Sequence, residues 1–198
     1  MTPAERIANY ERVTGWKDTL HADSSGVIWG YWVMGQDYRV KSGYHGGYPA
    51  TFLRRVKALF PDNPRALHLF SGMVDLETFP GDTVDSEIDR WPTYVDNAET
   101  LLTVPLGQYG LVLADPPYSN EDADRYGTPM INRNKVLKAL TRLPAGAFVG
   151  WLDTASVMYR KDEWAVVARI GMERSTNHRF RTFKVFQRKG PVVETEGL

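Results

Sequence analysis

The stretch Asp115–Tyr118, which reads Asp-Pro-Pro-Tyr, has the clearest chemical content in the sequence. It follows an apolar run at residues 111–114, which is typical of a buried strand. Neither Pro116 nor Pro117 can donate a backbone N–H, so the strand must end there. A carboxylate and an aromatic ring are thereby held at the end of a strand, where they can bind a polar ligand. The simpler interpretation is a turn in which Asp115 caps a helix and Tyr118 packs.

The surrounding sequence alternates between short apolar runs and amphipathic segments. Strands are predicted at residues 65–72, 81–89, 93–102, 109–118, 146–154, 163–174 and 179–189, the third of them turning into a helix. Helices are predicted to open at Pro49 and to span residues 132–143, where apolar side chains recur at helical spacing. The alternation predicts an α/β sheet that is mostly parallel, and the two consecutive strands at the end predict an antiparallel hairpin.

Acidic residues stand at the ends of four of the first five predicted strands, at Asp85, Asp96, Asp115 and Asp153. In open α/β sheets, ligands bind beyond the carboxyl ends of the strands, at the point where the strand order reverses. One aspartate at such a position often only caps the following helix. Four at one rim predict a site for a polar ligand that carries hydroxyl and amino groups.

Length and composition fit one domain of 198 residues, with 42% hydrophobic and 24% charged residues. We expect an aromatic N-terminal arm at residues 1–43, a catalytic core at 44–189 and a loose tail at 190–198. The chain has no cysteine and its four histidines are far apart, so disulfides and zinc–thiolate sites are excluded and no metal site is predicted. It has no run of about 20 apolar residues and no signal-peptide pattern, which predicts a cytoplasmic protein without a membrane partner.

Charge is distributed unevenly along the chain, although the formal net charge is zero. Residues 75–99 contain eight acidic side chains and one basic side chain, whereas residues 166–190 contain seven basic and one acidic. Two solvated faces would explain this pattern, and so would a nucleic-acid surface at the basic end.

In this context the chain resembles the S-adenosylmethionine-dependent amino-methyltransferases, which modify exocyclic amines of nucleobases, most often N6 of adenine. Their Asp-Pro-Pro-aromatic signature matches Asp115–Tyr118 in full, and the resemblance extends in order over residues 44–189. It implies a Rossmann-like, seven-stranded methyltransferase sheet and S-adenosylmethionine as the cofactor. One departure is that Gly72 is followed by Met73 and Val74, where many relatives carry a second glycine.

The resemblance also implies which residues contact the cofactor. Aromatic and small residues of a first motif lie under its methionine part, an acid at the end of the second strand holds its ribose hydroxyls, and a third motif meets its adenine amine. A further motif before the first helix of the core touches the methionine carboxylate. In chain order these positions are Tyr44, Tyr48, Phe70, Ser71, Gly72, Asp85, Asp96, Asn97 and Asp115.

The family's chemistry assigns a role to each residue of the Asp-Pro-Pro-Tyr stretch. An exocyclic amine is a poor nucleophile because its lone pair is delocalised into the ring. In the family the aspartate side chain and the carbonyl of the first proline each accept a hydrogen bond from one N–H of the amine, which turns the lone pair out of conjugation. The resemblance assigns these two roles to Asp115 and Pro116. Pro117 helps to keep these acceptors rigid. Tyr118 would stack on a base that has left its helix, and residues 119–127 could close over it.

The nucleic-acid surface is predicted on either side of Tyr118, at the turn between the last two strands and at the loop of residues 119–134, which contains Arg125 and Arg133 as well as three acidic residues. Its residue types suit phosphates and bases, although an edge hairpin guarded by charges would look the same. The candidates are Arg174, His178, Arg179 and Arg181. The aromatic residues of the arm are either base-stacking platforms or core, and they are Trp29, Tyr31, Trp32 and Tyr38.

We expect no separate target-recognition domain within these 198 residues. We therefore expect a DNA adenine-N6 methyltransferase of the small phage or bacterial type, with relaxed specificity or with a partner protein that supplies it. Cytosine N4 is the second candidate acceptor. The sequence also leaves open an RNA base methyltransferase that recognises shape, and an inactive relative that binds S-adenosylmethionine as a binding subunit.

Overall fold

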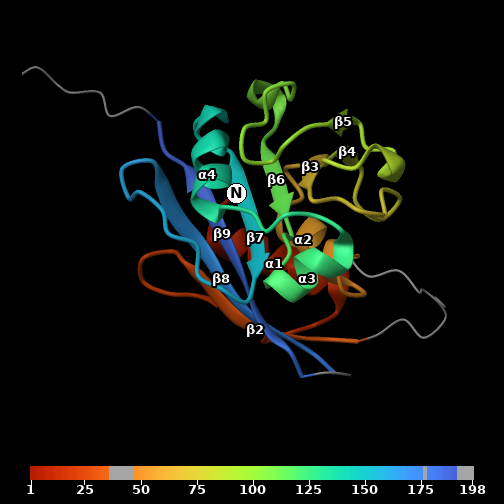
Figure 1. Ribbon diagram of the computed structural model, residues 1–198. Coiled ribbons are helices and arrows are strands. Elements are labelled where there is room, and N and C mark those ends of the chain that lie inside the picture. Colours follow the sequence, from red (N-terminus) through yellow and green to blue (C-terminus); the bar gives the residue numbers. More distant parts are fainter. Residues whose placement is uncertain (36–46, 176–177, 191–198) are drawn as a thin grey trace, which may run out of the picture.

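The computed structural model describes residues 1–35, 47–175 and 178–190, which form one mixed nine-stranded sheet in the order β1-β2-β8-β9-β7-β6-β3-β4-β5 (Figure 1). The strands are β1 (Leu20–Ala22), β2 (Ile28–Met34), β3 (Ala66–Leu69), β4 (Gly81–Asp85), β5 (Tyr94–Val95), β6 (Leu111–Ala114), β7 (Phe148–Asp153), β8 (Trp164–Arg174) and β9 (Phe180–Arg188). The α-helices are α1 (Pro3–Thr14), α2 (Phe52–Leu59), α3 (Asn120–Tyr126) and α4 (Arg133–Ala139).

The predicted fold class is confirmed. Strands β5, β4, β3, β6 and β7 are parallel neighbours, and β9 lies antiparallel between β7 and β8. The predicted count of seven strands is wrong, because β1 and β2 bring the sheet to nine. β2 pairs in parallel with β8 from Ile28 to Met34 and so covers what would otherwise be an open sheet edge.

Two apolar layers lie on opposite faces of the sheet. On one face α1 and α2 pack through Tyr10 and Phe52 against the side chains of β2, β8 and β9. On the other face α4 packs through Val136 and Leu137 over the centre of the sheet. Figure 1 shows α4 in front of the sheet and α1 and α2 behind it. The second face has no helix over β2 in the described ranges.

The N-terminal segment begins with a helix that the sequence analysis did not predict. Thr2 caps α1 by accepting a hydrogen bond from the backbone N–H of Glu5, and the Glu5 carboxylate accepts one from the backbone N–H of Thr2. Pro3 stands in the first turn, where its missing N–H costs nothing. The helix is anchored by Tyr10, whose ring stacks on Trp32.

The aromatic residues of the predicted arm fall into two groups. Trp32 is fully buried, whereas Trp29 and Tyr31 are exposed. Side chains alternate between the two faces of a strand, so the exposed pair lies on the face opposite α1 and α2. Tyr38 lies outside the described residues.

Some predicted elements are shorter than expected. α2 begins at Phe52 rather than Pro49, and α4 ends at Ala139, where a single 3₁₀ turn follows. The strand and helix predicted at residues 93–102 reduce to the two-residue β5 and a turn. The Asp96 carboxylate folds this turn by accepting hydrogen bonds from the backbone N–H and the hydroxyl of Thr103.

Candidate active site

The strand order reverses between β3 and β6, which is where ligands bind in open α/β sheets. The carboxyl ends of β3, β4, β6 and β7 share one rim because these strands are parallel. β9 is antiparallel to both β7 and β8, which brings the end of β8 and the start of β9 to the same rim. The stretch Asp115–Tyr118 thus lies between the loop after β3 and the β8–β9 turn.

Tyr118 folds back over Asp115, to which its hydroxyl donates a hydrogen bond. Two guanidinium groups lie against its ring, with the Cζ atoms of Arg179 and Arg181 4.9 and 4.8 Å from the ring centroid. In this structure the ring therefore lies over the carboxylate and contacts both guanidinium groups, and it does not stand open as a stacking surface.

Burial is the main influence on the Asp115 carboxyl group, and it raises the pKa of this group to about 6. The Tyr118 hydrogen bond and the positive charge of Arg181 act in the opposite direction. Burial and the nearby Asp115 charge raise the pKa of Tyr118 well above its usual value, so the phenol remains a donor. Above about pH 6, Asp115 is a partly buried carboxylate that can accept hydrogen bonds.

An ion pair holds the backbone of the Asp-Pro-Pro-Tyr stretch. Arg133, at the start of α4, binds Asp153 with 2.7 Å between Nε and Oδ2, and its Nη2 donates to the Tyr118 carbonyl at 3.3 Å. Asp153 is 1% exposed and also accepts hydrogen bonds from Trp151 Nε1 and the Ala155 backbone. Asp153, one of the four acids at strand ends, therefore anchors Arg133.

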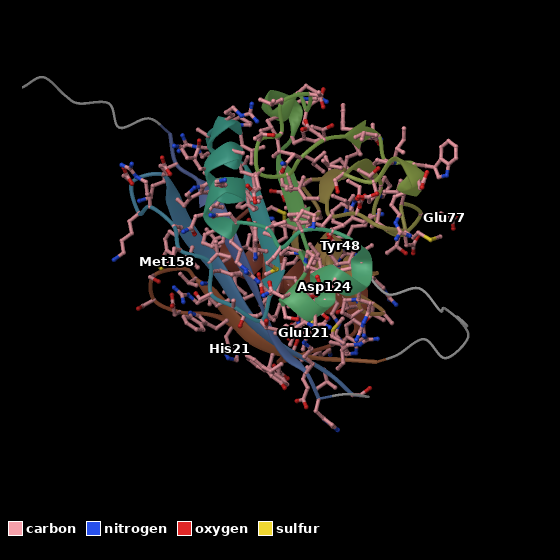
Figure 2. The ribbon with its side chains drawn as sticks, in the orientation of Figure 1. His21, Tyr48, Glu77, Glu121, Asp124 and Met158 are labelled. Atoms are coloured by element: carbon pink, nitrogen blue, oxygen red, sulfur yellow. The ribbon has the colours of Figure 1, made fainter. Side chains whose placement is uncertain are left out.

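The segment after Tyr118 forms helix α3, where the sequence analysis expected a closing loop. Ser119 caps the helix by accepting a hydrogen bond from the backbone N–H of Asp122. The Asp122 carboxylate in turn pairs with Arg179 at 2.8 Å, which ties α3 to the start of β9. Glu121 and Asp124, labelled in Figure 2, are exposed residues of α3.

Several buried polar atoms at this rim lack a hydrogen-bond partner in the described part of the chain. They include the Tyr48 hydroxyl, Arg174 Nε and Arg181 Nε, and all three side chains lie within electrostatic reach of Asp115. The buried Ser71 hydroxyl, just after β3, also lacks a hydrogen-bond partner in the described part of the chain. Buried polar atoms in folded proteins are normally hydrogen-bonded, so this group indicates a site for a ligand with donors and acceptors.

The loop after β3 turns tightly where a ligand would lie. Phe70 and Gly72 have φ angles of 57° and 48°, and the first value is unusual for a residue with a side chain. Ser71, between them, is buried. The Gly72 backbone N–H donates to Asp85 Oδ2 at 3.1 Å, while Asp85 Oδ1 accepts from the backbone of Glu87 at 3.0 Å. Each Asp85 oxygen retains capacity for another donor.

Asp96 and Asn97 already have partners within the turn after β5. Asp96 Oδ1 accepts from the Asn97 backbone at 2.7 Å, and Oδ2 accepts both hydrogen bonds from Thr103. The Asn97 side chain accepts a hydrogen bond from the Glu99 backbone at 2.8 Å. These two residues, predicted to meet the cofactor's adenine, fold their own loop in this structure.

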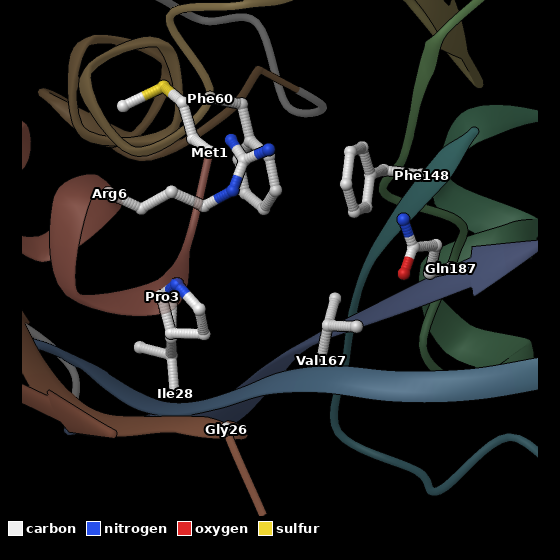
Figure 3. A pocket seen from close by; sticks show the side chains of 9 residues that line it. All are labelled: Met1, Pro3, Arg6, Gly26, Ile28, Phe60, Phe148, Val167 and Gln187. Carbon is white, nitrogen blue, oxygen red and sulfur yellow. The ribbon is translucent and has the colours of Figure 1, made fainter. Parts of the chain in front are cut away.

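Two hollows differ in size and in their place relative to the loop after β3. The larger, of about 350 Å³, lies beside Tyr48 and is also lined by Met73, one residue after Gly72. The smaller, of about 130 Å³, lies at the opposite ends of the strands, beside Phe148 at the start of β7, and Figure 3 shows Arg6 among its lining residues. Arg6 already pairs with Asp62 at 2.6 Å. The larger hollow is therefore the candidate for a cofactor site.

The described ranges contain no helix that is long and apolar enough to cross a membrane. They also contain no group of three or more His, Asp or Glu side chains placed to hold a metal ion.

Most of the predicted site residues that the structure describes gather at this rim. Those placed around Asp115 or the loop after β3 are Tyr48, Phe70, Ser71, Gly72, Asp85, Pro116, Pro117, Tyr118, Arg174, Arg179 and Arg181. His178 is exposed, and its Nδ1 lies 2.7 Å from Glu173 Oε1. Tyr44 lies outside the described residues.

Two ion pairs that shape the site were not predicted from the sequence, those of Arg133 and Asp122, although both residues lie in the loop 119–134 that was expected to border the nucleic acid. Their partners lie 20 and 57 positions away, at Asp153 and Arg179. No local spacing links residues so far apart, so only the fold reveals these pairs.

Comparisons with known proteins bear on the fold alone. No protein-family model and no curated protein matches the chain. Among solved structures, the chain is similar to the N-methyltransferase NodS of Bradyrhizobium japonicum, with a TM-score of 0.46, 11% identity, and 71% of this chain and 94% of that one covered. Two similar proteins are named as a methyltransferase of Escherichia coli (yhhF; TM-score 0.47, 12% identity, 80% and 97% covered) and a methylase of Haemophilus influenzae (TM-score 0.43, 10% identity, 68% and 86% covered). Likeness at this level does not extend to activity, substrate or cofactor.

Proposed function

We propose that the chain transfers a methyl group from S-adenosylmethionine to an exocyclic amine of a nucleobase, with adenine N6 in DNA as the first candidate. The supporting observation is the placement of Asp-Pro-Pro-Tyr at the point where the strand order reverses, with the Asp115 carboxylate partly buried near Arg174 and Arg181. The same stretch carries the resemblance to the amino-methyltransferases.

The residues present are suited to hold S-adenosylmethionine. The unpartnered Ser71 and Tyr48 hydroxyls can bind the polar groups of its amino-acid part, and Asp85 can accept hydrogen bonds from its ribose. The adjoining hollow of about 350 Å³ provides space for part of the molecule. When bound, this cofactor supplies an electrophilic methyl group on a sulfonium sulfur.

The chain's own residues prepare the amine. Asp115 accepts a hydrogen bond from one N–H and the Pro116 carbonyl accepts one from the other, so the lone pair turns out of conjugation. Because the Tyr118 hydroxyl is bonded to Asp115 in this structure, the incoming amine takes the place of the phenol. After transfer the methylated amine carries an extra proton, and a carboxylate whose pKa is raised to about 6 can accept it.

Radiolabelled methyl transfer tests this proposal. Wild type and Asp115→Ala would be incubated with tritiated S-adenosylmethionine and with DNA or RNA of matched sequence. We expect transfer to DNA, a loss of at least about 1000-fold in Asp115→Ala, and cofactor affinity within a few fold by calorimetry. Asp124→Ala, at an exposed acid of α3, is the matched control and should behave as wild type.

The other outcomes are equally specific. Full activity in Asp115→Ala would overturn the role given to this carboxylate. Transfer to RNA alone would replace the DNA substrate with the RNA alternative. Cofactor binding without transfer to either nucleic acid would identify the chain as a binding subunit.

A further inference from the structure

One face of the β2–β8–β9 sheet carries exposed aromatic side chains that the proposed reaction does not use. Trp29, Tyr31, Val33 and Phe180 are 43%, 42%, 57% and 55% exposed. The three β2 residues alternate with buried Ile28, Trp32 and Met34, so they share one side of the strand. We call this set, together with Arg169 of β8, the open face.

The aromatic side chains of the open face are arranged as a continuous surface. The rings of Tyr31 and Phe180 stack with centroids 6.3 Å apart, across strand β8. Gly171 of β8 makes this possible, because a Cβ atom there would lie 2.8 Å from the Tyr31 ring and 3.3 Å from the Phe180 ring. Trp29 stands two residues before Tyr31 on the same side of β2, about 6.6 Å along the strand.

Positive charge on the open face is not neutralised by ion pairs among the described residues. Arg169 lies over Trp29, with its Cζ 5.4 Å from the ring centroid, and Lys184 is its cross-strand neighbour. Neither cation has a carboxylate within ion-pair distance in the described ranges. Burial, with the charge of Arg169, lowers the pKa of Lys184. Lys184 is largely covered, so Arg169 is the cation that a ligand can reach.

Two carboxylates of this region orient the aromatic side chains. Glu173 accepts a hydrogen bond from the Tyr31 hydroxyl at 2.5 Å and contacts His178. Asp23 accepts one from Trp29 Nε1 at 2.8 Å. Both carboxylates keep their negative charge, so Arg169 is the position on the open face that suits a phosphate, and the flat aromatic rings beside it suit bases.

The open face meets the rim of the candidate active site at the start of β9. Phe180 is the first residue of β9, and its neighbours in sequence, Arg179 and Arg181, lie against the Tyr118 ring on the opposite side of the strand. A strand of nucleic acid whose target base is at Asp115 would reach Phe180 and Tyr31 by crossing this end of β9.

We infer that the open face binds the unpaired nucleic-acid strand next to the target base, with bases stacked on Phe180, Tyr31 and Trp29 and a phosphate at Arg169. The inference rests on the proposed function for its substrate class. It predicts that the protein prefers single-stranded to double-stranded nucleic acid, because duplex bases have no free faces to stack.

Fluorescence anisotropy with labelled single-stranded 12-mers of DNA and RNA would test this, without cofactor and with the full chain. The double variant Tyr31→Ala/Phe180→Ala should bind about 10-fold or more weakly. Trp91→Ala, at a residue that is 90% exposed outside the open face, is the matched aromatic control and should bind as wild type. Arg169→Gln leaves the core untouched and should reduce the salt slope by about 0.7.

Three results would overturn the inference. The first is wild-type affinity in both the double variant and Arg169→Gln, with native circular dichroism. The second is a higher affinity for duplex than for single strands. The third is a dimer in sedimentation that the double variant dissociates, because the open face would then be covered by a second copy of the chain.

The assay separates this inference from the proposed function. Binding of single strands that depends on the open face, with no methyl transfer to any nucleic acid, would keep the inference and remove the proposed reaction. Methyl transfer with unchanged binding in the variants would do the reverse.

Discussion

The strand order reverses between β3 and β6, and the acidic residues on the two sides of this point have different environments. On the β6 side, Asp115 is partly buried, its pKa is raised to about 6, and polar atoms without a partner in the described residues lie near it. On the side of β4 and β5, Asp96 lies in a turn whose N–H and hydroxyl groups it already binds. Burial acts to raise the pKa of Asp96, but the hydrogen bonds from Thr103, Asn97 and Leu102 together outweigh it and the pKa is lowered. Acids at equivalent strand ends can therefore be either part of a site or part of a loop.

Among the variants that test this contrast between acidic residues, we expect the largest loss of stability and activity at Asp153. In Asp153→Asn, the mostly buried Arg133 loses its counter-charge, which should cost about 3 kcal/mol of folding stability. The Tyr118 carbonyl also loses a fixed donor, so kcat should fall by about 10-fold at a temperature where the protein is folded, with cofactor affinity unchanged. Urea unfolding and steady-state kinetics would measure the two effects.

Asp162→Asn is the control for this variant, because the Asp162–Arg160 pair is exposed and should contribute little. If Asp153→Asn lost no more stability and activity than Asp162→Asn, the ion pair would have no positioning role.

The next effect contrasts the stability of Asp115→Asn and Asp96→Asn. The folded-state pKa of Asp115 lies above its unfolded value, so its contribution to stability is lost as pH rises through about 6. Asp115→Asn should therefore stabilise the protein at pH 8, by roughly 1–3 kcal/mol, and have little such effect at pH 4. Asp96 has a lowered pKa, so Asp96→Asn should destabilise the protein at pH 8.

Urea unfolding of both variants at pH 4 and pH 8 would measure these signs. Destabilisation by Asp115→Asn at pH 8 would mean that the carboxylate is favourable where it lies, and the contrast between the two sides would fail.

The smallest effect concerns the Tyr118 hydroxyl. Its hydrogen bond lowers the pKa of Asp115, so Tyr118→Phe should raise that pKa while keeping the ring. The acidic limb of the plot of kcat/KM against pH should then move to higher pH by up to about one unit. A limb that stays in place would show that Asp115 is not the group whose ionisation limits activity.

The fold was largely readable from the sequence because its signals are local. Apolar runs of strand length and the absence of a helix between the last two strands were enough to predict the sheet and its hairpin. Helix α1 was not predicted, although Thr2, Pro3 and Glu5 form a recognisable helix start. The aromatic residues that follow in the N-terminal segment favour strands. Strand β2 belongs to the sheet because it pairs with β8, more than 130 positions away, and no local sequence pattern predicts that pairing.

The candidate site was only partly readable. Asp115–Tyr118 was found because prolines after an apolar run are informative at any position. Whether Asp85 and Asp96 face a ligand or a backbone N–H depends on the conformation of their loops. The spacing of residues in the sequence does not predict that conformation. The role of Arg133 follows from its ion pair with Asp153, which only the fold reveals.

The most direct test of the central claim is the identity of the methylated product. DNA treated with the protein and S-adenosylmethionine would be digested to nucleosides, which would be separated and weighed by mass spectrometry. The account predicts one added methyl group on an exocyclic amine, as N6-methyladenine first and N4-methylcytosine second, and none with Asp115→Ala. A methyl group on a ring atom or on a phosphate, or the same product from Asp115→Ala, would contradict it.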